Sequence, residues 1–419
     1  MVSVQRLKVL KCWFMLFIGL GFGILSSCGD AQDQTLKLSN ISKRNIDLPV
    51  EWSSENLNLN GSLYEAKAIH DPAQRFFLQK TRPLLIPADG KTHSYCTVIP
   101  EAVTSGAYSL VPVRIETTLQ LNDDPENGRL HILDEGDPVL VYNYGKQLPS
   151  GIPDRYRRST YIHPLYSPSG VILTDDFPSD HYHHRGLSWM WPKVFIDGVR
   201  YDLWHIYGPQ AQYPGIHQLF EKWVIKETGP VCATLGVKNR WEIEGGKKVM
   251  DEWVLLRIYK SDGPYRAVDL FLTWKPVVPV EIEGADDKGY GGLNFRLAPR
   301  KETTLFSSEG REKRDSNLKP LPWADQSGLF ENKSDFDGVT IFQSYFNPDY
   351  PAGWCLRHYG FLGVAWPGVD RYRLETDKRL ELRFRLWIHD GDAEQGQVKE
   401  AFHFFKHSPE VSQDESKFK

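Results

Sequence analysis

The sequence predicts an all-β protein, built from a large antiparallel β-sandwich with a smaller β domain in front of it. Short strand-like runs bounded by Gly, Pro, Asn and Asp recur along the chain, and stretches of helical periodicity are scarce. Residues 380–389 alternate apolar and charged side chains, as a strand with one solvent-facing side does. Aromatic residues make up 13% of the 419 residues, which predicts large cores between sheets and leaves a handful of rings for a ligand.

The first segment has the features of an export signal. Three basic residues, Arg6, Lys8 and Lys11, precede an apolar run over 12–25 that is short for a membrane-spanning helix. The run ends in Leu-Ser-Ser-Cys28, which resembles the lipobox of bacterial lipoproteins, where the cysteine is acylated and becomes the new N-terminus. We therefore expect a signal peptide over 1–27 and a lipid on Cys28, and the alternative is an ordinary signal peptide with an incidental cysteine.

The expected location follows from that signal. Residues 28–35 are small and polar and predict a tether. The protein is expected to be exported and lipid-anchored to a bacterial membrane, at the periplasmic or the surface face of the outer membrane. After Cys28 no stretch approaches 18 uninterrupted apolar residues, so no further membrane span is expected.

The body divides into two predicted domains. Strand-like pieces over 36–118 predict an N-terminal β domain, and the strands of 119–407 continue without a Gly- or Ser-rich linker, which favours one large sandwich. Within them we expect strands at 110–116, 138–144 and 253–259, and a turn at 123–128. Residues 392–406 have helical spacing, and residues 408–419 predict a polar, frayed tail.

Charge and cysteine content exclude several classes of protein. The net charge of -4, with both signs interspersed, gives no field that would gather nucleic acid. The cysteines Cys96, Cys232 and Cys355 contain no CxxC pair, so neither a disulfide framework nor a cysteine zinc site is indicated, and we expect three buried, small apolar residues.

The densest patch of reactive side chains spans residues 180–187 and contains Asp180, His181, Tyr182, His183, His184 and Arg185. Histidine suits general acid–base catalysis because its pKa lies near neutrality. In an extended conformation alternate side chains face opposite sides, so only some of them could point at one substrate. The alternative is a histidine-rich loop whose imidazoles satisfy neighbouring backbone groups.

Further candidate residues lie elsewhere in the chain. His163 lies in a segment with two prolines, which stiffen a loop, and Asp392 follows His389 at the end of a predicted strand. Arg357 and His358 follow Trp354.

The motifs in this region resemble those of a known family. His163-Pro164 with Ser167-Pro168-Ser169-Gly170, and then the run from His183 to Leu187, look like the signature of the secreted bacterial proteins called "methane oxygenase PmoA", a family with no established activity. Similar motifs follow in order at 291–298, 323–328, 354–360 and 389–392, so the resemblance spans about 160–407. The region 36–118 more loosely resembles the leading β domain of supersandwich proteins related to galactose mutarotases and polysaccharide lyases.

The family's name implies methane oxidation, which the sequence disfavours. A membrane subunit of a methane monooxygenase needs several transmembrane helices, and no such span is predicted after Cys28. What the sequence favours is a lipid-tethered β-sandwich with a solvent-facing side rich in His, Arg, Asp and Trp, which suits a carbohydrate.

Two classes of function remain open. The enzyme would be a lyase, in which a histidine moves the proton and an arginine pairs with a substrate carboxylate, or a hydrolase with two carboxylates, such as Asp325 with Asp392 or Glu309. The alternative is a glycan-binding lipoprotein without turnover. No complete set of metal ligands is legible, so no cofactor is assigned, although a divalent metal stays open.

The sequence thus gives a set of candidate site residues. Eight of them are expected to meet across the sandwich: His163, His183, His184, Arg185, Arg296, Arg357, His358 and His389. The candidate catalytic residues are His183, His184, Arg185, Asp325 and Asp392. The candidate substrate-binding residues are His163, His181, Tyr182, Arg296, Trp354, Arg357, His358 and His389.

Overall fold

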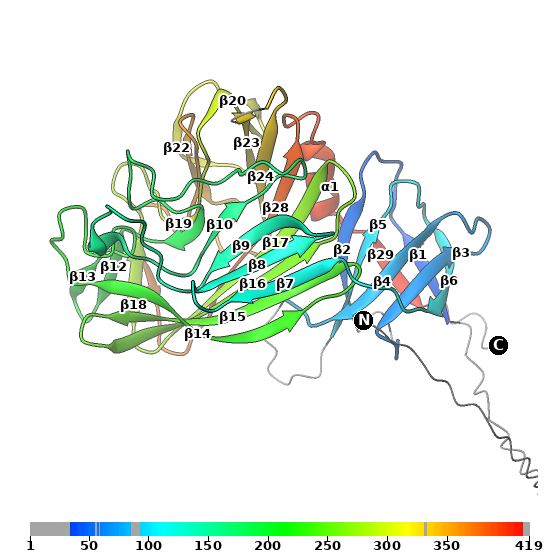
Figure 1. Ribbon diagram of the computed structural model, residues 1–419, viewed down its shortest axis with the longest axis horizontal. Helices are drawn as coiled ribbons and strands as arrows, with labels where there is room; N and C mark the ends of the chain where they lie inside the picture. Colours follow the sequence, from blue (N-terminus) through cyan, green and yellow to red (C-terminus); the bar gives the residue numbers. More distant parts are fainter. Residues whose placement is uncertain (1–33, 55–56, 58, 85–92, 331–332, 414–419) are drawn as a thin grey trace, which may run out of the picture. The chain divides into compact units, whose positions relative to one another are not determined.

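Two nine-stranded antiparallel sheets pack face to face and enclose the main core of the protein (Figure 1). The computed structural model describes residues 34–54, 57, 59–84, 93–330 and 333–413. The expected signal peptide, most of the tether and the lipidation site Cys28 lie outside these residues. Within them, no helix is long and apolar enough to cross a membrane.

The strands of the sandwich come from the whole length of the chain after residue 118. Sandwich sheet 1 has the order β22 (Ser316–Pro320), β25 (Gly353–Arg357), β26 (Phe361–Ala365), β19 (Gly292–Arg296), β11 (Leu187–Met190), β10 (Tyr161–Leu165), β9 (Asp137–Asn143), β8 (Arg129–Asp134) and β7 (Leu119–Asp124). Sandwich sheet 2 has the order β14 (Ile216–Glu227), β15 (Cys232–Ile243), β16 (Lys247–Tyr259), β17 (Tyr265–Pro276), β28 (Leu380–Asp390), β24 (Asp337–Gln343), β23 (Trp323–Phe330), β20 (Arg300–Ser307) and β21 (Gly310–Arg311).

The expected all-β class with large antiparallel sheets is confirmed. Its core is aromatic, as the composition suggested: Trp189, Trp241 and Trp274 are fully buried between the two sheets. Burying such rings contributes roughly 1.5–3 kcal/mol for a large apolar side chain, which makes this interior the main source of stability.

Two smaller sheets complete the fold. A four-stranded sheet has the order β13 (Val199–Tyr201), β12 (Lys193–Ile196), β18 (Val280–Glu283) and β27 (Tyr372–Leu374). The N-terminal sheet has the order β2 (Leu48–Ser53), β5 (Ser94–Ile99), β4 (Arg75–Thr81), β3 (Leu63–Ala68), β6 (Gly106–Pro112), β1 (Gln34–Ser39) and β29 (Glu410–Gln413). A 3-10 helix spans Asp154–Tyr156.

The expected strands are found at 138–144, 253–259 and 380–389, as β9, β16 and β28. The expected turn at 123–128 joins β7 to β8 as a hairpin. The strand expected at 110–116 ends earlier, at Pro112 in β6. In the second half of β28 both faces are buried, because Trp387 packs into the cluster of the N-terminal sheet while its neighbours Leu386 and Ile388 pack into the sandwich core.

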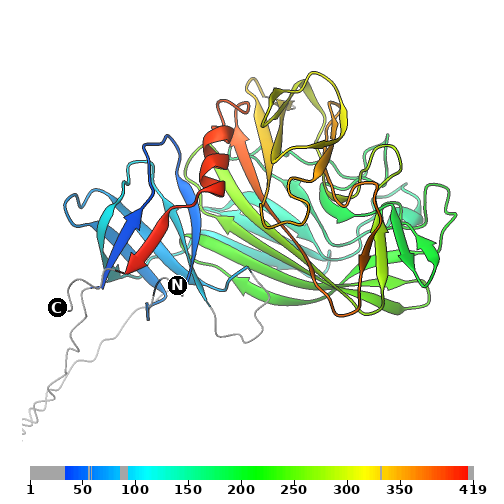
Figure 2. The same ribbon diagram turned by 180° about the vertical axis from the view of Figure 1, so that it is seen from behind.

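The end of the chain differs from the expectation. The helix α1 spans Val398–Lys406 and starts six residues later than expected, because residues 391–397 form turns in which Gly391 and Gln397 have positive φ angles. The expected polar tail is also wrong in part, since residues 410–413 form β29. This strand pairs with β1 and supplies Val411 to the core of the N-terminal sheet (Figure 2).

Candidate functional site

Four histidines gather on the outer side of sandwich sheet 1. His181, His183 and His184 lie in the loop before β11, and His205 lies in the loop after β13. The ring centroids of His183 lie 4.6 Å from those of His184 and 4.3 Å from those of His205, and the rings of His181 and His184 stack at 4.7 Å. The three histidines expected from the sequence therefore meet, and a fourth joins them. We call these four residues the histidine cluster.

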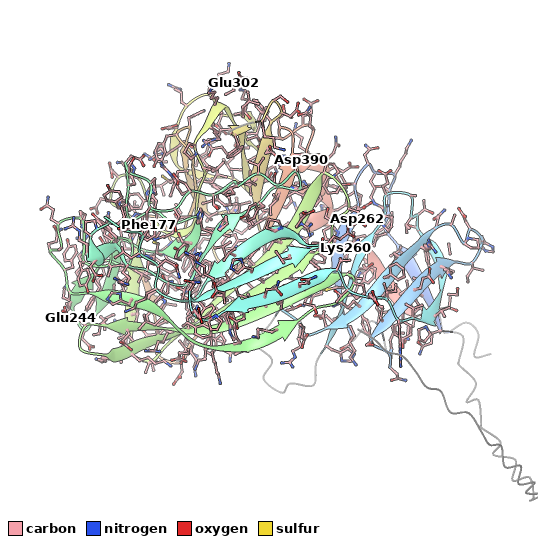
Figure 3. The ribbon with its side chains drawn as sticks, in the orientation of Figure 1. Phe177, Glu244, Lys260, Asp262, Glu302 and Asp390 are labelled. Atoms are coloured by element: carbon pink, nitrogen blue, oxygen red, sulfur yellow. The ribbon has the colours of Figure 1, made fainter. Side chains whose placement is uncertain are left out.

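Arg185 fixes the loop that carries three of these histidines. Its guanidinium is buried and donates hydrogen bonds to the carbonyl oxygens of Tyr182 (2.7 Å), His184 (2.6 Å) and Tyr156. The guanidinium also lies 3.4 Å from the ring centroid of Phe177, which Figure 3 labels. Because Nη1 and Nη2 are used inside the protein, Arg185 positions the loop, and its expected catalytic role stays a prediction.

Gly186 lets this loop lie tightly against β10. A Cβ atom at this position would lie 2.3 Å from the carbonyl oxygen of Ile162, closer than real Cβ contacts allow. The glycine of the His-His-Arg-Gly motif is thus explained by the close approach of two backbone segments.

Stacked aromatic and imidazole rings extend from sandwich sheet 1 to the protein surface. His184 stacks on Phe361 of β26 at 5.4 Å, and His181 stacks on Tyr359 at 5.9 Å with an interplanar angle of 6°. Tyr359 is 48% exposed, whereas Phe361 is buried. Trp204 packs edge-on against His184 from the side of the second loop. The cluster therefore has an aromatic base and an exposed aromatic end.

His205 is held by a buried carboxylate. Its Nδ1 lies 2.8 Å from Oδ2 of Asp202, and its backbone N–H donates to Oδ1 of the same side chain. Asp202 is 1% exposed. A carboxylate bound at Nδ1 favours the tautomer with the proton on that nitrogen, which leaves Nε2 free to accept a proton.

Arg296 places a cation beside the cluster. It alternates on β19 with the core residues Leu293 and Phe295, so its side chain points outward. Its Nη2 lies 3.0 Å from both carboxylate oxygens of Asp180, and its guanidinium carbon lies 4.8 Å from the ring centroid of Tyr359. The expected meeting of Arg296 with the histidines is therefore found.

Electrostatics keep the inner histidines uncharged. Burial lowers the pKa of His183 well below its ordinary value, and the neighbouring His184 and His205 add to the effect. Burial also lowers the pKa of His184, with Arg296 adding to it. Both imidazoles are therefore neutral near pH 7.

Several polar atoms near the cluster have no partner within the described part of the chain. These are Oγ of Ser188, Oδ1 of Asn294, Nδ1 of His184, and Nε and Nη1 of Arg296. Ser188 and Asn294 are direct neighbours across β11 and β19, and Asn294 lies two positions before Arg296. Buried polar groups are normally hydrogen-bonded, so a concentration of unpartnered groups at one place marks a candidate site.

Asp325 and His389 lie elsewhere and form a pair of their own. Oδ2 of Asp325 lies 2.8 Å from Nε2 of His389 and accepts a hydrogen bond from Thr340, and both members of the pair are 0% exposed. Asp392 accepts hydrogen bonds from the backbone N–H groups of residues 394 and 395, in the turn before α1. The carboxylate of Asp325 is therefore sealed in the interior and that of Asp392 shapes a turn, and the expected catalytic roles of both stay predictions.

Three other candidates also have structural roles. Trp354 is fully buried and donates its Nε1–H to the carbonyl of Leu321. Arg357 donates to the carbonyl of Ser316 and to the side chain of Asn317, on the neighbouring strand β22. These partners give Trp354 and Arg357 structural roles, and their expected substrate-binding roles stay predictions.

Two other candidate histidines and a tyrosine have partners outside the histidine cluster. His358 adjoins Tyr359, but its Nδ1 lies 2.8 Å from Asp315, so its imidazole is used at the surface. Tyr182 packs against Tyr156 at 5.8 Å. His163 contacts Thr174 and lines a separate cavity of about 310 Å³ that Asp176 also lines.

In the described residues, no group of three or more His, Cys, Asp or Glu has the geometry of a metal site. The cysteines Cys96, Cys232 and Cys355 are buried and unpaired, as expected for small apolar residues. The histidine cluster thus combines neutral imidazoles of His183 and His184 with the guanidinium of Arg296 and the exposed phenol of Tyr359.

Sequence reasoning missed Asp202, Trp204, His205 and Tyr359. A signal was present for the first three, because an aspartate three positions before a histidine, with a tryptophan between them, is an arrangement in which the carboxylate can orient the imidazole. Tyr359 lay inside a motif that was noticed for its neighbours Arg357 and His358.

A family model described as "Family of unknown function (DUF6807)" matches residues 129–403. Among curated proteins, none matches the chain. This match leaves the resemblance to the family called methane oxygenase PmoA untested.

Two solved structures from Enterococcus faecalis are similar to this chain. One is a protein in the glycosyl hydrolase family 38, with a TM-score of 0.43 and 8% identity over 91% of this chain and 47% of the other. The second is an alpha-mannosidase, with a TM-score of 0.44 and 10% identity over 92% of this chain and 46% of the other. The chain spans about half the length of these proteins, and at such TM-scores the likeness carries no statement about activity.

Proposed function

This chain belongs to the DUF6807 family, and we propose that it is a glycan-degrading enzyme whose histidine cluster transfers protons. The observation that carries the proposal is the pair His183 and His205. The rings lie 4.3 Å apart, the imidazole of His183 is held neutral, and His205 is oriented by the buried Asp202. A base that is fixed by a third group is the usual arrangement for proton transfer in enzymes.

Elimination is the reaction that these residues support best. In this reaction Nε2 of His205, with the ring of His183 packed against it, removes the proton beside the carboxylate of a uronic acid. The electron pair left behind forms a carbon–carbon double bond, and the bond to the leaving oxygen breaks. The phenol of Tyr359 returns a proton to that oxygen, and the guanidinium of Arg296 stabilises the charge on the substrate carboxylate.

Hydrolysis has less support because the carboxylates near the cluster are occupied. Asp180 is paired with Arg296 and His181, and Asp202 is buried against His205. The carboxylates suggested by the sequence serve elsewhere, since Asp325 is sealed in the interior and Glu309 pairs with Lys319 at the surface.

The second candidate is a glycan-binding protein without turnover. The exposed ring of Tyr359, stacked on His181, supports it, because a flat aromatic ring can lie against the apolar face of a sugar. The export signal and the lipid on Cys28 remain part of the proposal in either case. A Cys28→Ala protein that still partitions fully with membranes would contradict the anchor.

The deciding experiment is a screen of the purified protein against uronic-acid-containing and neutral polysaccharides, following reducing ends and the ultraviolet absorbance of unsaturated products. We expect the absorbance to rise on an acidic glycan. His183→Ala and His205→Ala should each lower kcat by roughly 100- to 10,000-fold, while the surface control His358→Ala should retain it. Glycan binding without any product would favour the binding protein, and full activity in both cluster variants would exclude this site.

A further inference from the structure

We propose that a groove bordered by the N-terminal sheet, sandwich sheet 2 and α1 binds a neutral oligosaccharide, at a place distinct from the histidine cluster. The groove has a volume of about 970 Å³, within the roughly 300–1,000 Å³ common for small-molecule sites. Its walls come from the segment around Ile41, the loop between β24 and β25, residues 383–385 of β28, and the end of α1. The choice of a carbohydrate rests in part on the proposed function.

Two aromatic side chains at this groove are exposed to solvent. Phe346 is 64% exposed and Tyr345 is 52% exposed, the two highest values among the large apolar residues of the described chain. Their ring centroids lie 4.1 Å apart with an interplanar angle of 34°. Single exposed apolar residues are ordinary, but a paired and exposed aromatic surface beside a groove is typical of a ligand-binding place.

The loop that carries these rings is fixed. Asn347 is buried, and its side-chain amide donates to the carbonyl of Arg383 at 2.9 Å and accepts from the backbone N–H of the same residue at 2.7 Å. The backbone N–H of Ser344 also donates to the carbonyl of Arg383. A loop held by three hydrogen bonds presents its rings without a further ordering cost when a ligand binds.

Arg383 adds a planar group with hydrogen-bond donors to this surface. Its guanidinium carbon lies 5.4 Å from the ring centroid of Phe346 and 5.3 Å from that of Phe271, and Nη2 lies 2.9 Å from Glu381. Flat rings beside hydrogen-bonding groups match a sugar, which has apolar ring faces and a rim of hydroxyl groups.

The charges of the groove indicate a neutral ligand. Its positive side chains are Arg383, Arg385 and Lys406, and its negative side chains are Glu51, Asp269 and Glu410. Asp269 is ion-paired with Arg385 and Glu51 with Arg257, so neither sign is left in clear excess. A polyanion would find no concentrated positive field here, and a lipid tail would meet too many charged groups.

The test is a calorimetric titration of the purified full chain with four probes. Cello-, manno- and xylo-oligosaccharides are the neutral probes, and oligogalacturonate is the acidic probe. We expect one neutral probe to bind, and Phe346→Ala to weaken its binding roughly 10- to 100-fold through loss of the stacking surface. Val199→Ala, at another exposed apolar residue, on β13, should leave binding unchanged.

Three results would overturn the inference: no binding of any neutral probe, binding that survives Phe346→Ala, or an equal effect of Val199→Ala. The proposed function fails separately. His183→Ala should lower turnover strongly but leave binding of the neutral probe intact. If the protein binds the probe in this groove and degrades no polysaccharide, the binding site in the groove is supported and the proposed enzymatic function is not.

Discussion

Replacing Arg185 by methionine should destabilise the protein rather than weaken substrate binding alone. The change removes three charge-assisted hydrogen bonds, to the carbonyl oxygens of Tyr156, Tyr182 and His184. It also leaves the largely buried carboxylate of Asp176 without the cation that lies 3.6 Å away. Breaking a buried charge pair by removing one partner lowers the free energy of unfolding by roughly 3–5 kcal/mol, and typical native stabilities are about 5–15 kcal/mol.

The assay is urea unfolding followed by tryptophan fluorescence, with Arg185→Lys as the matched variant. Lysine keeps the charge but cannot reach three carbonyl oxygens with a rigid planar group, so its loss of stability should be intermediate. The positioning role would be wrong if the free energy of unfolding of Arg185→Met lay within about 0.5 kcal/mol of that of the parent, which is the range of ordinary surface changes. If only the affinity for an acidic glycan fell, Arg185 would be a ligand residue.

Three further outcomes follow from the same structure. His389→Ala should lower the free energy of unfolding by roughly 3–5 kcal/mol because Asp325 loses its buried partner. Burial alone would lower the pKa of His389, but Asp325 raises this pKa overall. Denaturation curves should therefore show the full loss of stability below pH 6.5 and a smaller loss above the raised pKa. Burial raises the pKa of Asp176 from 3.8 to about 6. The stability that this group contributes is therefore present below pH 3.8, and the free energy of unfolding falls by roughly 3 kcal/mol as pH rises to about 6. In Asp176→Asn, the free energy of unfolding measured across this interval should not show this fall. Gly186→Ala should lower the unfolding midpoint by an amount equivalent to roughly 1–3 kcal/mol, because the new methyl group meets the carbonyl of Ile162, and an unchanged midpoint would contradict the close approach.

The sequence was most informative where a local pattern determines structure. The alternation at 380–389 belongs to β28, and the turn residues at 123–128 join β7 to β8. His181, His183 and His184 could be assigned to one place because they are neighbours in the chain.

Tertiary packing decided what the local pattern could not. The fully buried pair of Asp325 and His389 joins two strands that lie 64 positions apart, and no local pattern shows whether such a pair faces a ligand or the interior. Arg185 looked like a ligand residue because it adjoins two histidines, but its partners come from the backbone, which sequence spacing does not reveal. Sequence reasoning noticed the chemistry of each motif and could not assign the direction in which its side chains point.

The pairing of β1 with β29 sets an order of events during synthesis (Figure 2). Leu36 faces Gln413 in this pair, so the N-terminal sheet receives β29 only after residues 410–413 have been synthesised. Such contacts between distant positions form slowly, because the chain between them must first be ordered. The edge of β1 is open to other strands until then, so pairing with β29 protects it from association with other chains.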